Sequence, residues 1–155
     1  MSVTIKKAKT ISADNNHARC LFCGNLNPKS LKLSFHAGVN GIVETRFKAE
    51  PELQGYDDFL HGGVLSGLLD AAMTHCLFHQ GIQAVTGDLH VRFVRPVACG
   101  TFMDICAWVQ LSSPPLYRLK AEIKVEDQLM ARAEGKFVRW GGLNEGREQE
   151  DPDAG

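Results

Sequence analysis

One segment of this chain of 155 residues has the length and pattern of a largely buried helix, and strand-like segments lie on both sides of it. Apolar side chains recur at helical spacing over residues 63–79, and on a wheel of 100° per residue they cover a broad arc. The arc consists of Val64, Leu65, Leu68, Leu69, Ala72, Met73 and Cys76. It is wider than a surface helix needs, so we expect a sheet to wrap around this helix.

Six strand-like segments accompany the helix. Residues 31–38 and 41–50 precede it and are joined at Asn40-Gly41, a dipeptide typical of hairpin turns. Four more follow it, at residues 83–97, 101–112, 116–127 and 128–140. The third of these alternates apolar and charged residues, and the short connections favour antiparallel neighbours. The predicted fold class is therefore α+β, an antiparallel sheet around one central helix in the order β-β-α-β-β-β-β.

Composition excludes several kinds of partner. The formal net charge is −1, with 17 basic and 18 acidic residues, so we expect neither nucleic acid nor an anionic membrane as the main partner. No apolar run reaches the roughly 18 residues that span a bilayer. The five cysteines are an odd number and no secretion signal is evident, so we expect a cytoplasmic protein without disulfides. We expect a flexible N-terminus at residues 1–18, one domain at 19–140 and a disordered acidic tail at 141–155.

Two stripes of the predicted helix lie outside its apolar arc: Ser66, Asp70 and Thr74 form one, and Gly63, Gly67 and Ala71 form the other. Small residues allow another backbone or a ligand to approach closely. Asp70 lies too far along the helix to cap its start. It is therefore either a solvated acid or, beside a groove, a general base or nucleophile.

The sequence His61-Gly62-Gly63 lies where the helix begins. The first N–H groups of a helix have no partner within it and lie at the positive end of its dipole. Without side chains in front of them, they can bind the oxygen of an acyl group. The alternatives are a plain turn into the helix and, for His61, a capping role in place of orienting a carbonyl.

The stretch "HGGVLSGLLDAAM", followed by "VTGDLHVRFVRPVACGT", resembles the hotdog-fold thioesterases of the phenylacetate-pathway type. Their pattern is His-Gly-Gly, an aspartate nine residues after the histidine, and a strand that ends in Arg-Pro or Leu-Pro. The similarity runs from about Gly55 to Trp140, and "CLFCGNLNPKSLKLSF" resembles an opening found in a subgroup of the superfamily. The resemblance implies a hotdog fold, hydrolysis of an acyl-CoA thioester without a cofactor, and a homodimer or homotetramer.

The resemblance also implies roles for single residues. Asp70 matches the catalytic carboxylate, Gly62 the residue whose N–H polarises the thioester carbonyl, and His61 the histidine near that carbonyl. The implied substrate-binding residues are Gly63, Gln54, Asp88, Arg95, Tyr117 and Arg118. Of these, Arg95 matches a position near the phosphates of coenzyme A, and the pair 117–118 a position near its nucleotide.

The chain departs from the family pattern at two positions. Gly55 stands where related enzymes often have an asparagine, so either Gln54 replaces that side chain or the chemistry differs. Asp88 stands where related enzymes can have serine or threonine. A second carboxylate beside Asp70 would raise the pKa of one of them, and a surface position is the alternative.

Two further groups contain potential metal ligands. His17, Cys20 and Cys23 have zinc-ligand spacing, but a structural site uses four ligands, so we expect metal-free cysteines and keep a structural metal as the alternative. His75 and His79 are one helical turn apart without an evident third ligand. For them we expect positions in solvent or at an interface.

Two functions compete with thioester hydrolysis. A hotdog hydratase or dehydratase would use His61 and Asp70 for α-proton chemistry, and a non-catalytic protein would bind acyl-CoA without hydrolysing it. Geometry adds an expectation about assembly. Gly62 and Asp70 are eight residues apart, about 12 Å along a helix, so both can serve one carbonyl only if two subunits share the site.

Overall fold

The computed structural model of the chain describes residues 9–10 and 17–140. The acidic tail at 141–155 and nearly all of the expected flexible N-terminus lie outside these residues. The elements are β1 (Lys9–Thr10), β2 (His36–Ala37), β3 (Val43–Lys48), α1 (Gly62–His79), β4 (Ala84–Phe93), β5 (Phe102–Ser113), β6 (Leu116–Val125) and β7 (Gln128–Arg139). Two short 3-10 helices, Val39–Gly41 and Pro51–Leu53, flank β3.

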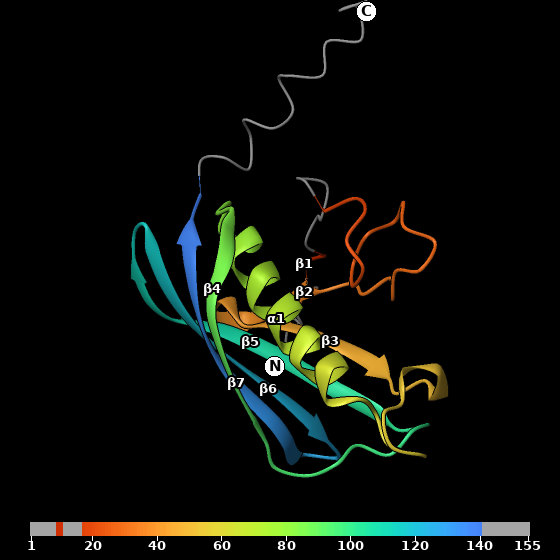
Figure 1. Cartoon of the computed structure of the whole chain (residues 1–155). Coiled ribbons are helices and arrows are strands. Elements are labelled where there is room, and N and C mark those ends of the chain that lie inside the picture. The colour runs from red at the N-terminus through yellow and green to blue at the C-terminus, as the bar shows by residue number, and fades with distance from the viewer. Residues whose placement is uncertain (1–8, 11–16, 141–155) are drawn as a thin grey trace, which may run out of the picture.

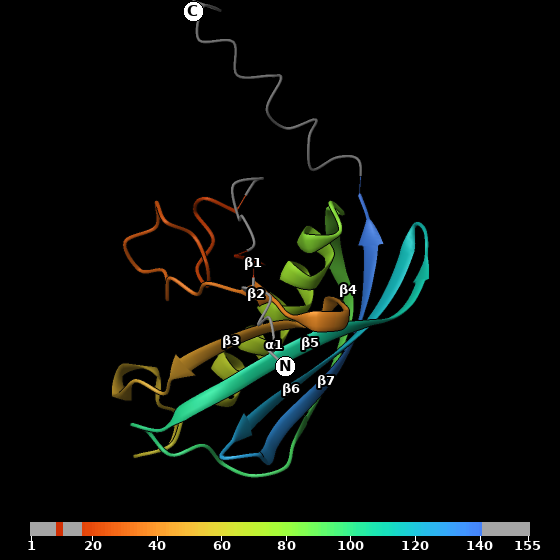
Figure 2. The same cartoon turned by 180° about the vertical axis from the view of Figure 1, so that it is seen from behind.

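The strands form one antiparallel sheet in the order β1-β2-β3-β5-β6-β7-β4. Helix α1 lies across one face of this sheet, which curves around it (Figure 1). The opposite face carries no helix of the described chain (Figure 2). The predicted fold class is confirmed: one helix against an antiparallel sheet, with the main elements in the predicted order.

The core lies between α1 and the concave face of the sheet. In β6 the alternation predicted from the sequence is present, because Leu119, Ala121 and Ile123 are buried. Helix and sheet approach closely at Gly135, where a Cβ atom would lie 3.0 Å from the sulfur of Met73. Among the described helices, none is long and apolar enough to cross a membrane.

The predicted hairpin before α1 is present, but its first strand is much shorter than expected. Asn40 and Gly41 have φ angles of 64° and 73°, the left-handed conformation that an Asn-Gly turn provides. Only His36–Ala37 pairs with β3. The residues before β2 bond elsewhere, since Leu31 and Leu33 donate backbone hydrogen bonds to the carbonyls of residues 21 and 22.

The outer side of α1 is covered by the chain's own segment 17–33, which corrects the expectation of a free helix face. Phe22 lies against Gly67, where a Cβ atom would come within 2.1 Å of its ring. Ala71 and Thr74, expected on open stripes, are 8% and 9% exposed. The small stripe therefore accommodates a phenyl ring of the same chain at Gly67 instead of a second subunit.

Candidate active site

The start of α1 leaves one backbone donor open. His61 is the N-cap residue, and its Nδ1 accepts a hydrogen bond of 2.8 Å from the N–H of Gly63. Val64 and Leu65 donate to the carbonyl of His61. The Gly62 N–H has no acceptor within the part of the chain that the structure describes. His61 thus has the capping role, and Gly62 presents its N–H at the positive end of the helix.

The cap also sets the proton position on His61. A neutral imidazole whose Nδ1 accepts a hydrogen bond carries its proton on Nε2. The ring is exposed, so Nε2 is available as a second donor beside the Gly62 N–H. This is the protonation state that can stabilise an oxygen of a substrate.

A cavity of about 620 Å³ borders this helix start. It is lined by Gln54, Gly55, Tyr56, Phe59, Leu60, His61, Gly62 and Pro96. Gln54 does not replace the missing asparagine with its carbonyl oxygen, because Oε1 accepts the Asp58 N–H at 3.0 Å. Gly55 packs on His61, where a Cβ atom would lie 3.3 Å from its Cα and Cδ2 atoms. A side chain at position 55 would therefore press on the capping histidine.

Asp70 lies on α1 beside strand β4 and is neither fully solvated nor fully buried. The hydroxyl of Thr86 donates a hydrogen bond of 2.6 Å to its Oδ1 atom. Burial raises the pKa of the Asp70 carboxyl, while the Thr86 hydrogen bond and the charge of His17 lower it. The carboxylate is thus partly shielded from water yet held in one orientation, as a general base requires.

The hydroxyl beside Asp70 is Thr86, which the sequence reasoning missed. A bulge in β4 separates Thr86, opposite Phe137, from Asp88, opposite Lys136, and leaves Gly87 as the extra residue. Asp88 is exposed and forms an ion pair of 3.8 Å with Lys136. Of the two alternatives for Asp88, the structure shows the surface position, and burial is the cause that raises the pKa of Asp70.

The remaining residues expected to bind substrate lie in three different environments. Arg95 is exposed in the connection after β4, next to Pro96 of the cavity. Tyr117 is 2% exposed in the core, so the expectation that it contacts a nucleotide is wrong. Arg118 is exposed and borders a separate hollow together with Asp88, on the face of the sheet away from α1.

Within one chain, the two groups expected to catalyse are far apart. Gly62 and Asp70 belong to one uninterrupted helix, so about 12 Å of helix axis separates them. Gly62 lines the cavity, whereas Asp70 faces Thr86 and does not line it. Asp70 instead lies close enough to His17 for each to shift the pKa of the other.

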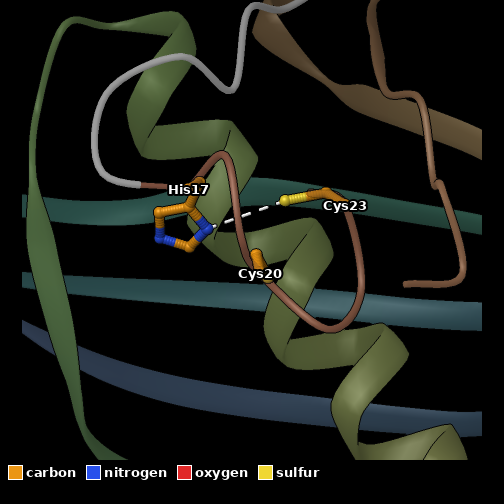
Figure 3. Close-up of side chains that lie close together, drawn as sticks. All are labelled: His17, Cys20 and Cys23. Atoms are coloured by element: carbon orange, nitrogen blue, oxygen red, sulfur yellow. Dashed lines mark hydrogen bonds between the residues drawn. The ribbon is translucent and has the colours of Figure 1, made fainter. Parts of the chain in front are cut away.

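The two histidine groups have different surroundings. His17, Cys20 and Cys23 converge on the outer side of α1 (Figure 3). His75 is 1% exposed, so the expectation of a solvent or interface position is wrong for this chain. Its ring stacks on Phe35 at 4.4 Å, and neither ring nitrogen has a hydrogen-bond partner among the described residues. His79, at the end of α1, is exposed.

A protein-family model described as "Thioesterase superfamily" matches residues 58–113, the segment that contains the helix start, Asp70 and Thr86. This segment is similar to the thioesterase superfamily, and the chain has the hotdog fold. The E. coli PaaI protein, from the phenylacetic acid degradation operon, has a similar structure. The TM-score is 0.62 at 24% identity, covering 64% of this chain and 76% of PaaI.

Two other solved structures share the fold. A crystal structure of a thioesterase superfamily protein has a TM-score of 0.70 at 22% identity. The match covers 74% of this chain but only 60% of the other. A Streptococcus mutans protein bound to acetyl CoA has a TM-score of 0.63 at 19% identity, with coverage of 65% and 82%.

Proposed function

We propose that the protein hydrolyses an acyl-CoA thioester to a free acid and coenzyme A. The observation that carries the proposal is the Gly62 N–H, which has no acceptor among the described residues, lies at the positive end of α1 and borders a cavity of about 620 Å³. This arrangement suits a carbonyl oxygen that gains negative charge during attack. The match of residues 58–113 to the thioesterase superfamily model, together with acetyl CoA bound to the Streptococcus mutans protein, supports this substrate class.

In the proposed reaction, a water molecule attacks the thioester carbon while Asp70 accepts the proton of that water. The N–H of Gly62 donates to the oxyanion of the tetrahedral intermediate, and Nε2–H of His61 is available as a second donor. The C–S bond then breaks, and the proton on Asp70 passes to the leaving thiolate. Direct attack by the Asp70 carboxylate, followed by hydrolysis of an acyl-Asp70 intermediate, uses the same residues.

Because Gly62 and Asp70 are far apart in one chain, the proposal includes a homodimer in which each site combines Gly62 of one subunit with Asp70 of the other. Strand β4 is the edge of the sheet next to Asp70, and Phe93 at its end is 52% exposed beside Gly62. An exposed strand edge and an apolar side chain favour association of two copies along β4. A pairing of dimers into a tetramer is compatible with this arrangement.

The oxyanion role can be tested by removing one hydrogen atom. Gly62 is the first helical residue, where proline is tolerated, and His61 has φ −62° and ψ 133°, the conformation that a following proline requires. Gly62→Pro therefore deletes the N–H while the helix start is kept. We expect kcat to fall about 10²–10³-fold. Gly62→Ala retains the N–H, places its Cβ in ordinary contact with Phe93, and serves as the control.

The role of Asp70 is tested with Asp70→Asn, for which we expect a loss of about 10²–10⁴-fold in turnover with the fold retained. Asp104→Asn, at an exposed position of β5, is the control. The assay is thiol release across acyl-CoA chain lengths and aryl-CoAs. Tight binding without thiol release would identify a non-catalytic binder, and turnover of enoyl-CoA without thiol release would identify a hydratase.

A further inference from the structure

The segment 17–33 has no regular secondary structure but contributes to the core. Cys23 and Leu33 are 5% and 7% exposed, and Phe22 packs into the space that Gly67 leaves. An irregular segment of this length loses much conformational entropy when it is fixed in place, and it makes few backbone hydrogen bonds in return. A cross-link inside the segment would offset that loss.

A tight turn brings three side chains of this segment together. Cys20 donates a backbone hydrogen bond to the carbonyl of His17, and Gly24 donates one to the carbonyl of Cys20. A Cβ atom at position 24 would lie 2.4 Å from the backbone nitrogen of Cys20, so the turn requires glycine. The turn places Cys23 beside Cys20 and His17.

The ligand atoms of these three residues are close to the spacing of a metal site. His17 Nδ1, or Nε2, and the two Sγ atoms lie within 4.8 Å of one another. Cys23 Sγ is 3.6 Å from His17 Nδ1 (Figure 3). Tetrahedral Zn²⁺, with bonds of about 2.3 Å to sulfur and about 2.0–2.1 Å to nitrogen, separates such a pair by about 3.6 Å. Small side-chain rotations would bring Cys20 into the same sphere.

We propose that His17, Cys20 and Cys23 bind one Zn²⁺ ion, which clamps segment 17–33 onto the outer side of α1. Two thiolates and one imidazole form a ligand set that favours zinc over the harder cations magnesium and calcium. Water or a small exogenous ligand would complete the four-coordinate site. The ion is structural: it holds Phe22 against Gly67 and the His17 ring against Phe78. The centroids of the His17 and Phe78 rings are 4.8 Å apart, and the rings meet edge to face.

The test uses the full-length chain, reduced with a phosphine, stripped with a chelator and titrated with Co²⁺ and Zn²⁺. We expect one Co²⁺ per chain, with a thiolate-to-cobalt charge-transfer band in the near ultraviolet and intense visible bands from tetrahedral geometry. Zn²⁺ should displace the Co²⁺ and raise the melting temperature of the stripped protein, because it binds the folded state.

Variants identify the ligands. Cys20→Ser should retain about half of the charge-transfer intensity per cobalt bound, since one of two thiolates remains. Cys20→Ser and His17→Gln should each weaken binding at least about tenfold. Cys99→Ser and His79→Gln, outside the cluster, should bind like the wild type. If Cys23→Ser, at the buried position, does not fold, the other two ligand variants still decide the question.

Two results would overturn the proposal. One is a fully reduced wild-type chain that takes up no stoichiometric Co²⁺ or Zn²⁺. The other is uptake that Cys20→Ser and His17→Gln leave unchanged, because the ion would then be bound elsewhere. Neither readout depends on thioester hydrolysis, so failure of the proposed function would leave this test intact.

Discussion

The hydroxyl of Thr86 donates a hydrogen bond of 2.6 Å to the carboxylate of Asp70, linking the edge strand β4 to the central helix. The bond lowers the pKa of Asp70, opposing the effect of burial, and fixes the orientation of the carboxylate. In the proposed reaction it is the ionised form of Asp70 that accepts a proton. The hydrogen bond therefore helps to keep the base active at lower pH.

Replacing Thr86 by valine should shift the acid limb of the pH–rate profile to higher pH. Loss of the hydrogen bond removes one of the two effects that lower the pKa of Asp70, so a smaller fraction is ionised at a given pH. The measurement is kcat/KM between about pH 4 and pH 8. Thr86→Ser retains the hydroxyl and should restore the wild-type profile. A Thr86→Val profile that coincides with the wild type would mean that Asp70 is not the group that titrates.

Arg95 is expected to bind the phosphates of coenzyme A. It is exposed next to Pro96 of the cavity, where a guanidinium group can pair with a phosphate at its entrance. Arg95→Ala should raise KM for acyl-CoA more than for a truncated pantetheine thioester that lacks the nucleotide phosphates. Arg46→Ala, on strand β3, is the matched control. Equal effects of Arg95→Ala on both substrates would exclude phosphate recognition by this residue.

The lowered pKa of His75 should make the folded protein less stable in mild acid than at neutral pH. Burial, with a contribution from the charge of His17, lowers its pKa to about 4, whereas the unfolded chain binds this proton at about pH 6.5. Between these pH values the unfolded state binds more protons, so the free energy of unfolding decreases as the pH falls from 6.5 to 4. The full loss is about 3 kcal/mol.

His75→Phe isolates this contribution. A phenyl ring keeps the stacking with Phe35 and carries no unpartnered nitrogen, so stability at pH 7 should increase by about 1 kcal/mol. Urea unfolding of this variant should show a weaker dependence on pH between 4 and 6.5 than the wild type. His79→Gln, at the exposed end of α1, should retain the wild-type dependence. Equal slopes for His75→Phe and the wild type would show that folding does not lower the pKa of His75.

The order of elements was predictable because it depends on local patterns. The alternation that ends in Val125, the helical period of 63–79 and the Asn40-Gly41 turn are each properties of short windows, and all three are present. The features that sequence reasoning missed depend on contacts between distant segments. Phe22 packs against Gly67, which is 45 positions away in the sequence, and nothing in the sequence around either residue indicates this contact.

The environment of Asp70 was the least predictable part of the candidate site. The extra residue Gly87 shifts the side of the sheet that each β4 residue faces, so a hydroxyl expected near position 88 is supplied by Thr86. The bulge depends on how β4 pairs with β7, and apart from a glycine no sequence pattern marks it. His17 reaches Asp70 only because segment 17–33 folds back over α1. Candidate residues could thus be proposed from the sequence, but their neighbours could not.

The shared-site arrangement predicts complementation between two inactive variants. Asp70→Asn retains the Gly62 N–H, and Gly62→Pro retains the Asp70 carboxylate, so a mixed dimer contains one site with both groups intact. Random pairing after joint unfolding and refolding makes about half of the dimers mixed, and each has one good site of two. About a quarter of the wild-type activity should therefore return. Each variant refolded alone is the control, and mixed dimers are counted by a size tag on one of the two chains. If mixed dimers form and the sample stays inactive, Gly62 and Asp70 do not act on one thioester across the interface.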